Sequence, residues 1–237
     1  MKKIVILVVL CLISYKSTAQ STDVFFAKAD VFFSKHFKNG RVAYTAIKKD
    51  TKELNEILDL AKSLQVDRAN AKEYQAFWIN GYNLTVIKSI VENYPIKSPL
   101  DKAGFFDKTK HAIGAKSITL NDIENKLLRG NFPEEPRFHF VLVCAGLGCP
   151  PIINKAYIPS TLEKQLEMQT KKALNNPDFI QVNKNKVKIS QIFEWYKGDF
   201  TKNGSLVDYI NIYKEEKLPM KVKVSYYPYD WTLNNLK

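Results

Sequence analysis

Two cysteines on either side of a glycine-rich turn are the residues of this chain best suited to covalent chemistry. Cys144 and Cys149 enclose the sequence AGLG, and Pro150 follows directly. A thiol at the start of a helix has a lowered pKa, because the helix dipole stabilises the nucleophilic thiolate. In an oxidising compartment, however, two cysteines this close also pair. The sequence therefore supports two interpretations, a Cys149 nucleophile and a Cys144–Cys149 disulfide.

One histidine, His139, lies just before the cysteines and is the second candidate catalytic residue. The run from Phe138 to Cys144 is apolar on both faces and predicts a central buried strand. There His139 is either a satisfied core residue or a general base. Along a strand it lies about 16 Å from Cys144, at about 3.3 Å per residue. This distance argues against a His139–Cys149 dyad and against a zinc site formed with both cysteines, and we expect no metal or cofactor. His36 and His111 remain candidate partners for the thiol.

Two amides lie three residues apart in the most apolar part of the chain. Asn80 and Asn83 flank Tyr82 and share one face of a predicted helix. Buried amides need hydrogen-bond partners, because an unpaired one costs about 1–3 kcal/mol. They either form the polar floor of a pocket together with Tyr82 and His139, or they tie down neighbouring backbone.

Charged residues cluster on a short predicted helix that starts after Thr119 and ends at Gly130. Glu124 is a candidate buried acid that pairs with Arg129 or Arg137. The alternative is that such residues cap the helix and face solvent, which is more common for side chains of this type. If they instead line a cleft, Glu124 and Arg129 are candidate ligand-binding residues.

The elements that must position these groups follow from hydrophobic periodicity and from Gly and Pro punctuation. Residues 96–116 are predicted to form a long loop. The remaining pattern predicts helices at 25–37, 52–64, 71–94, 160–174, 190–196 and 206–213, a hairpin of 179–182 with 187–189, an extended piece at 42–44 and a last strand at 222–227. With no repeat and no Ser/Gly linker, these elements predict one α+β domain over residues 20–237.

Composition and charge limit the class of protein. The 237 residues are 45% hydrophobic and 25% charged, which excludes a disordered chain, a collagen, a coiled coil and a disulfide-rich miniprotein. The formal charge is +12, but the lysines are scattered singly and in pairs such as Lys48-Lys49. A scattered pattern indicates a solvated basic surface, so we expect no nucleic acid partner.

The amino-terminal residues resemble a secretory signal. A basic start at Lys2-Lys3 precedes an apolar run that ends at Ile13, and small residues follow up to Ala19. This pattern predicts cleavage after Ala19 and a periplasmic or secreted protein with no stable membrane anchor, because the apolar run is shorter than the about 20 residues of a spanning helix. Removing residues 1–19 takes away three lysines and no acid, which lowers the charge to +9.

Several ordered motifs resemble the DUF547 family, a domain of unknown function. They span about residues 42 to 235 and are FWINGYN at 77–83, LNDIE at 120–124 with Leu128-Arg129, PRFHF at 136–140, CPP at 149–151, IF at 192–193 with Trp195-Tyr196 and Asp199-Phe200, and YDWTLN at 229–234. The resemblance implies a papain-like or transglutaminase-like scaffold, in which a central helix packs on a mainly antiparallel sheet with extra helices around it.

In that scaffold the nucleophilic cysteine begins the central helix, and the base histidine opens a strand. By resemblance, the helix at 76–94 is the central helix, His139 is the strand histidine, and the nucleophile's place falls near Asn80. An asparagine cannot form a thioester, so either the centre is degenerate or Cys149 has taken over. We therefore expect a cleft that binds a peptide or a cell-envelope ligand, with a thiol-dependent hydrolase or acyltransferase as the alternative. The oligomeric state is not predicted.

Overall fold

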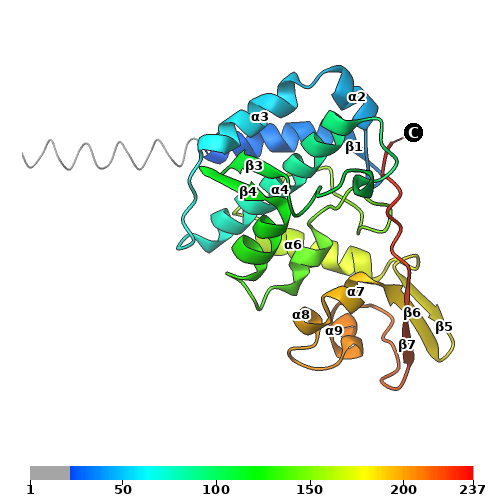
Figure 1. Ribbon diagram of the computed structural model, residues 1–237. Coiled ribbons are helices and arrows are strands. Elements are labelled where there is room, and N and C mark those ends of the chain that lie inside the picture. The colour runs from blue at the N-terminus through cyan, green and yellow to red at the C-terminus, as the bar shows by residue number, and fades with distance from the viewer. Residues whose placement is uncertain (1–21, 237) are drawn as a thin grey trace, which may run out of the picture.

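The computed structural model describes residues 22–236 and has a mixed α+β fold (Figure 1). The α+β class expected from the sequence is confirmed. The predicted signal segment, residues 1–19, lies outside the described residues. Within residues 22–236, the strands are spread over three small sheets of two, two and three strands rather than gathered in one. Among residues 22–236, no helix is both long and apolar enough to cross a membrane.

The amino-terminal half is built around one buried helix. α4 (Ala71–Asn93) is covered by a helix at residues 22–36, by α2 (Tyr44–Lys49) and by α3 (Lys52–Ser63), which lie together at one end of the molecule (Figure 1). The phenylalanines of the first helix are buried as predicted, because their helical spacing places them on one face. Tyr94 and Pro95 end α4 where the sequence predicted.

The segment predicted as a loop contains structure of its own. It forms η1 (Pro99–Asp101) and a hairpin of β3 (Lys110–Ile113) and β4 (Lys116–Thr119), so the prediction of a continuous loop was wrong. The hairpin was missed because its strands are short and half-exposed, while the Gly114-Ala115 turn holds both residues at positive φ. After it, the Thr119 hydroxyl accepts a hydrogen bond from the Asp122 amide and caps α5 (Leu120–Asp122), which continues into the π-helical η2 (Ile123–Arg129).

The predicted central strand at Phe138–Cys144 does not form. The chain there makes a short 3₁₀ helix, η3 (Pro136–Phe140). Pro136 favours a helix start, and the Glu135 carboxylate caps the helix by accepting a hydrogen bond from the backbone N–H of Arg137. Beyond it, the amide of Asn83 binds the backbone in place of a neighbouring strand, donating to the Val141 carbonyl at 3.0 Å and accepting from the Val143 N–H at 2.9 Å. The segment is apolar because the side chains of η3 and of the residues that follow it are buried in the core, without forming a strand.

The carboxy-terminal half lies at the opposite end of the molecule (Figure 1). The predicted hairpin forms as β5 (Ile180–Asn183) and β6 (Lys186–Ser190), and β7 (Lys223–Tyr227) adds to β6 in parallel. The predicted helices form as α6 (Leu162–Leu174), α7 (Ile192–Trp195) and α9 (Leu206–Tyr213), and a short helix that was not predicted, α8 (Lys197–Phe200), follows α7.

The last residues connect the two halves. After β7 the chain runs back toward β1 (Phe37–Lys38) and β2 (Arg41–Val42), as the red segment of Figure 1 shows. On the way, the Leu233 N–H donates to Lys97, and the Leu236 N–H donates to Val42. This return brings residues 229–234 against the turn between the two cysteines.

Candidate functional site

The turn between the cysteines is held against the carboxy-terminal segment by backbone hydrogen bonds. The N–H groups of Leu147 and Gly148 each donate at 2.8 Å, to the carbonyls of Thr232 and Asp230. A Cβ on Gly148 would lie 2.8 Å from the Asp230 nitrogen, so only glycine permits this approach. The glycines of the turn therefore allow it to pack closely against residues 229–234.

Hydrogen-bond donors converge on the sulfur of Cys149. The backbone N–H of Cys144 donates to it at 2.9 Å, and the hydroxyl of Tyr229 donates at 2.7 Å. The two cysteines are free thiols in the structure, and the Cys144 thiol also interacts with the Cys149 sulfur. Hydrogen bonds to a charged group favour its charged form, so this arrangement stabilises a thiolate.

The pKa values of the two thiols are driven apart. Burial alone would raise the pKa of Cys149, but hydrogen bonds from the Cys144 thiol, the Tyr229 hydroxyl and the backbone of Cys144 and Gly146 lower it. The pKa of Cys144 is raised well above its usual value, because its thiol is hydrogen-bonded to Cys149 and is desolvated. Of the two thiols, Cys149 is therefore the more acidic.

A small pocket of about 140 Å³ reaches Cys149. Its walls come from the β1–β2 turn at residues 39–41, from the cysteine turn with Pro150 and Pro151, and from Asn234. Cys149 lines this pocket, and 9% of the residue is exposed. Arg41 places a cation at the same opening.

His139 belongs to a second cluster. Its Nε2 is hydrogen-bonded to Asp199 Oδ2 at 2.8 Å, and the same oxygen accepts a hydrogen bond from Arg129 Nε at 2.7 Å. The ring centroids of Tyr196 and His139 are 4.0 Å apart. The Arg129 guanidinium lies over the Tyr196 ring, 4.6 Å from its centroid. We call these four residues the His139 cluster. Burial alone would raise the pKa of Asp199, but the hydrogen bonds and charges of His139 and Arg129 hold it well below its usual range.

The ion pairs expected for Glu124 do not form as predicted. Arg129 pairs with Asp199, and Arg137 pairs with Glu135 and Glu163. Arg137 finds one carboxylate two residues before it, at Glu135, and a second on α6, while α8 supplies Asp199 to Arg129. Glu124 is instead hydrogen-bonded to Tyr196, and its charge adds to the effect of burial on the pKa of Tyr82.

Tyr82, on α4, is influenced by both the cysteine pair and the His139 cluster. Burial raises its pKa well above the usual value, and interactions with Glu124, Cys144, Tyr196 and Cys149 add to this effect. Groups from both clusters therefore act on one buried hydroxyl on α4. The structure brings Tyr82, Glu124, Arg129, His139 and the cysteines into one region of the molecule.

The two asparagines of α4 are engaged by backbone. Asn80 donates to the carbonyls of Ala76 at 2.8 Å and Tyr157 at 2.6 Å, and accepts from the Tyr157 N–H at 3.0 Å. Asn83 binds Val141 and Val143, as described above, and both side chains are at most 1% exposed. Their polar groups hold the chain around α4 in place.

Tyr229, Asp199 and Tyr196 were not singled out by reasoning from individual residues. Each falls in a motif that carries the family resemblance, and that was the signal available in the sequence. The other two histidines lie elsewhere: His36 is 3.6 Å from Glu53, and His111 is on β3. Within residues 22–236, no three histidine, cysteine, aspartate or glutamate side chains gather as metal ligands would.

Comparison with known families gives one result. Residues 66–173 match the model of a family described as "Protein of unknown function, DUF547". The match contains α4, η2, η3 and both cysteines, and it confirms the resemblance seen in the sequence. No curated protein and no solved structure matches the chain.

Proposed function

We propose that this member of the DUF547 family is a thiol-dependent acyl-transfer enzyme, a hydrolase or an acyltransferase, with Cys149 as its nucleophile. The observation that carries the proposal is the pair of hydrogen bonds to the Cys149 sulfur, from Cys144 N–H at 2.9 Å and from Tyr229 O–H at 2.7 Å. A buried thiol held in this way is stabilised as the thiolate, which is the reactive form.

The chemistry needs no base for its first step. The Cys149 thiolate attacks the carbonyl carbon of an acyl substrate, the bond to the leaving group breaks, and the leaving group takes a proton from solvent or from the Tyr229 hydroxyl. The resulting thioester then reacts with water or an amine, which loses a proton, and the thiolate is restored. A preformed thiolate suits substrates whose leaving groups are weak bases, such as thioesters and activated esters.

The site differs from the papain-like arrangement that the family resemblance suggests. There the nucleophile opens the central helix, whereas the corresponding place in α4 holds Asn80, whose amide binds backbone. In this proposal the nucleophile has moved to the turn at Cys149, and the pocket beside Arg41 receives the acyl group. The signal-like start of the chain supports an exported protein, so we expect an ester or thioester of a cell-envelope component as substrate.

One observation favours a second candidate, the non-catalytic binding module expected from the sequence. His139 Nε2 is hydrogen-bonded to Asp199 and its ring packs against Tyr196, so the histidine that the family scaffold would use as a base has its partners in this cluster and not at Cys149. In this case the region around Tyr82 and the cysteines would recognise a peptide or envelope ligand without transforming it.

The test is acyl-enzyme formation with p-nitrophenyl acetate. The purified protein should release a burst of nitrophenol, and mass spectrometry should find one acetyl group on Cys149. Cys149→Ser should abolish both signals, while Cys144→Ser, which keeps the nucleophile, should still be acetylated. A protein that gains no acetyl group at Cys149 would exclude the catalytic proposal. Turnover that depends on His139, measured with His139→Ala, would argue against the binding module.

A further inference from the structure

One face of the three-stranded sheet gathers lysines that are scattered along the sequence. In β6, Lys186 and Lys188 are exposed and alternate with buried apolar residues, so both lie on the solvent side of the sheet. The register of β6 with β7 pairs Lys223 with Lys186, and side chains at paired positions share a face. Neighbouring strands are about 4.8 Å apart, and Lys186 and Lys188 are about 6.6 Å apart at about 3.3 Å per residue. Three ammonium groups are thus held close together.

Two further lysines lie at the end of the sheet where β5 turns into β6. Lys184 is in that turn, and Lys221 comes two residues before Lys223. The Lys223 N–H donates to the Asn185 carbonyl at 3.0 Å, so the start of β7 adjoins the turn. All of these lysines are exposed. We call Lys184, Lys186, Lys188, Lys221 and Lys223 the lysine face.

Carboxylates do not pair with the lysine face. The three strands contain no aspartate or glutamate, and no lysine of the face forms an ion pair within residues 22–236. The lysines that do form ion pairs in this part of the chain lie elsewhere: Lys28, Lys35, Lys88, Lys126, Lys155, Lys171 and Lys202. The lysine face therefore carries a local excess of positive charge.

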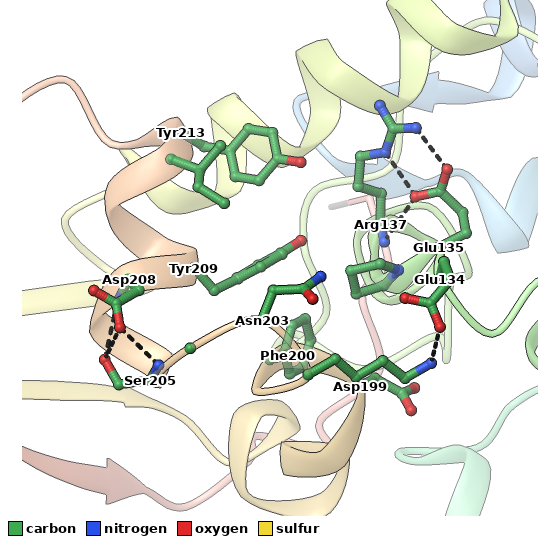
Figure 2. A pocket seen from close by; sticks show the side chains of 14 residues that line it. Glu134, Glu135, Arg137, Asp199, Phe200, Asn203, Ser205, Asp208, Tyr209 and Tyr213 are labelled. Carbon is green, nitrogen blue, oxygen red and sulfur yellow. Dashed lines mark hydrogen bonds and ion pairs between the residues drawn. The ribbon is translucent and has the colours of Figure 1, made fainter.

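The pocket between η3 and α9 shows the contrasting arrangement (Figure 2). There Arg137 donates to Glu135 at 2.6 Å, and Lys202 donates to Glu134 at 2.9 Å. Cations and carboxylates in that pocket satisfy one another. The lysine face has no comparable pairs among the residues that the structure describes.

The stability of the sheet does not account for these lysines. Lysine on an edge strand can prevent pairing with another chain, but β6 is the central strand in the order β5-β6-β7. Lys186 and Lys223 are at paired positions, and like charges directly opposite one another destabilise a sheet. A bound anion would remove this repulsion. The arrangement therefore favours a partner of negative charge.

We propose that the lysine face docks reversibly on the surface of an anionic lipid bilayer. Its cations form a two-dimensional array over two strands and a turn, which meets several headgroups of a membrane plane at once. Met220, directly before Lys221, is 63% exposed and can enter the apolar edge of the headgroup layer. A soluble polyanion would use the lysines but not Met220. This inference is independent of the chemistry proposed for Cys149.

Vesicle binding measures this docking. Purified protein is sedimented with vesicles of phosphatidylcholine alone, or of phosphatidylcholine and phosphatidylglycerol in equal parts. It should bind the anionic vesicles at least about tenfold more tightly, and added salt should weaken that binding because it screens surface charge. Free glycerol phosphate at the same phosphate concentration should not displace the protein, because it engages few lysines at a time. Equal binding to both vesicles, or displacement by glycerol phosphate, would overturn the proposal.

Removing charge from the face is compared with removing the same charge elsewhere. The double variant Lys186→Gln, Lys188→Gln should weaken binding to the anionic vesicles about 25-fold, at about fivefold per lysine. The control is Lys48→Gln, Lys49→Gln, whose exposed lysines lie on α2 at the other end of the molecule (Figure 1). It should bind within about twofold of the unaltered protein. Both variants keep the same amino terminus, so equal losses would mean that only net charge matters, and the proposal would fail.

A charge reversal separates docking from folding. Lys223→Glu places a carboxylate beside Lys186, which replaces a repulsion by an attraction, so the Tm should be unchanged or higher. The same variant should weaken vesicle binding about 25-fold, because it changes the charge of the face by two units. A lower Tm with unchanged vesicle binding would assign Lys223 to the fold and overturn the proposal.

Met220 distinguishes a bilayer from a soluble polyanion. Met220→Gln should weaken vesicle binding several-fold and leave the binding of polyphosphate unchanged, because only the bilayer offers an apolar layer. Unchanged vesicle binding in this variant would overturn the proposal in favour of a soluble polyanion. Tighter binding of polyphosphate than of anionic vesicles, at equal phosphate concentration, would do the same.

Discussion

The hydroxyl of Tyr229 donates a hydrogen bond to the sulfur of Cys149 across 2.7 Å, although the two residues are 80 positions apart in the chain. The contact exists because residues 229–234 pack on the Gly146–Gly148 turn, where side chains other than hydrogen would collide with backbone. The return of the carboxy-terminal segment thus supplies one of the hydrogen bonds that lower the pKa of this thiol.

Replacing the donor should change that acidity. Tyr229→Phe removes one of the hydrogen bonds that lower the pKa of Cys149, so the pKa should rise. The rate of alkylation by iodoacetamide, measured against pH, should show its midpoint at higher pH. Tyr226→Phe serves as the control and should leave the midpoint in place; an unshifted midpoint in Tyr229→Phe would mean that the hydroxyl does not stabilise the thiolate.

The close approach of the cysteine turn should be sensitive to a single methyl group. In Gly148→Ala the new Cβ would lie 2.8 Å from the Asp230 nitrogen, and the shift needed should lower the free energy of unfolding by about 1–3 kcal/mol. Gly198→Ala is the matched control, because a Cβ there meets nothing within 4 Å in helix α8, and it should be neutral or slightly stabilising. Chemical denaturation measures both, and equal stabilities would contradict the packing described.

The role of Asn80 can be separated from ligand binding by stability alone. Asn80→Ala leaves the backbone N–H and carbonyl of Tyr157 unpaired in the core and creates a cavity, so it should cost about 2–4 kcal/mol. Asn93→Ala, at the half-buried end of the same helix, should cost less than about 1 kcal/mol. An Asn80→Ala protein of native stability would show that the amide is not needed to hold the fold.

The Asp199 ion pairs should make stability depend on pH in the acid range. The folded-state pKa of Asp199 lies below its unfolded value of about 3.9. As the pH falls, the carboxylate is therefore protonated in the unfolded state at a higher pH than in the folded state. The stabilisation is complete above that value and is lost as the pH falls through the folded-state pKa. Asp199→Asn should cost about 1–2 kcal/mol at neutral pH and progressively less below about pH 4. The exposed Asp59→Asn on α3 is the control, and a cost independent of pH would contradict the ion-pair account.

The contact between the two thiols should also allow oxidation. The Cys149 thiolate attacks glutathione disulfide and releases one glutathione, and the Cys144 thiol, on losing its proton, then displaces the second to form an internal disulfide. Mass spectrometry should find a protein lighter by two hydrogens that no longer reacts with iodoacetamide until it is reduced. Cys144→Ser should stop at the mixed disulfide. A stable mixed disulfide in the unaltered protein would show that the two sulfurs cannot bond.

Local features of the fold were predictable from the sequence. The apolar periodicity of α4 and α6, the Asn183-Lys184-Asn185 turn between β5 and β6, and the Thr119 cap are all decided within a few residues, and each appears where it was expected. The prediction of a strand at Phe138–Cys144 was wrong because an apolar run has the same sequence pattern whether it is buried as a strand or as a short helix followed by a loop. The error also removed the basis of the 16 Å estimate for His139, whose partner in the structure is Asp199.

By itself, the sequence determined the α+β class, the resemblance to the DUF547 family, most helices and the set of polar residues that needed partners. Only the tertiary structure decided which partners they have: Asn80 binds Tyr157, His139 binds Asp199, and Cys149 binds Tyr229, over separations of 60 to 80 positions. Helical periodicity and caps are short-range and can be read along the chain. Contacts at these separations depend on how whole elements pack, because buried polar groups take whichever donor or acceptor the packed core brings within hydrogen-bonding distance.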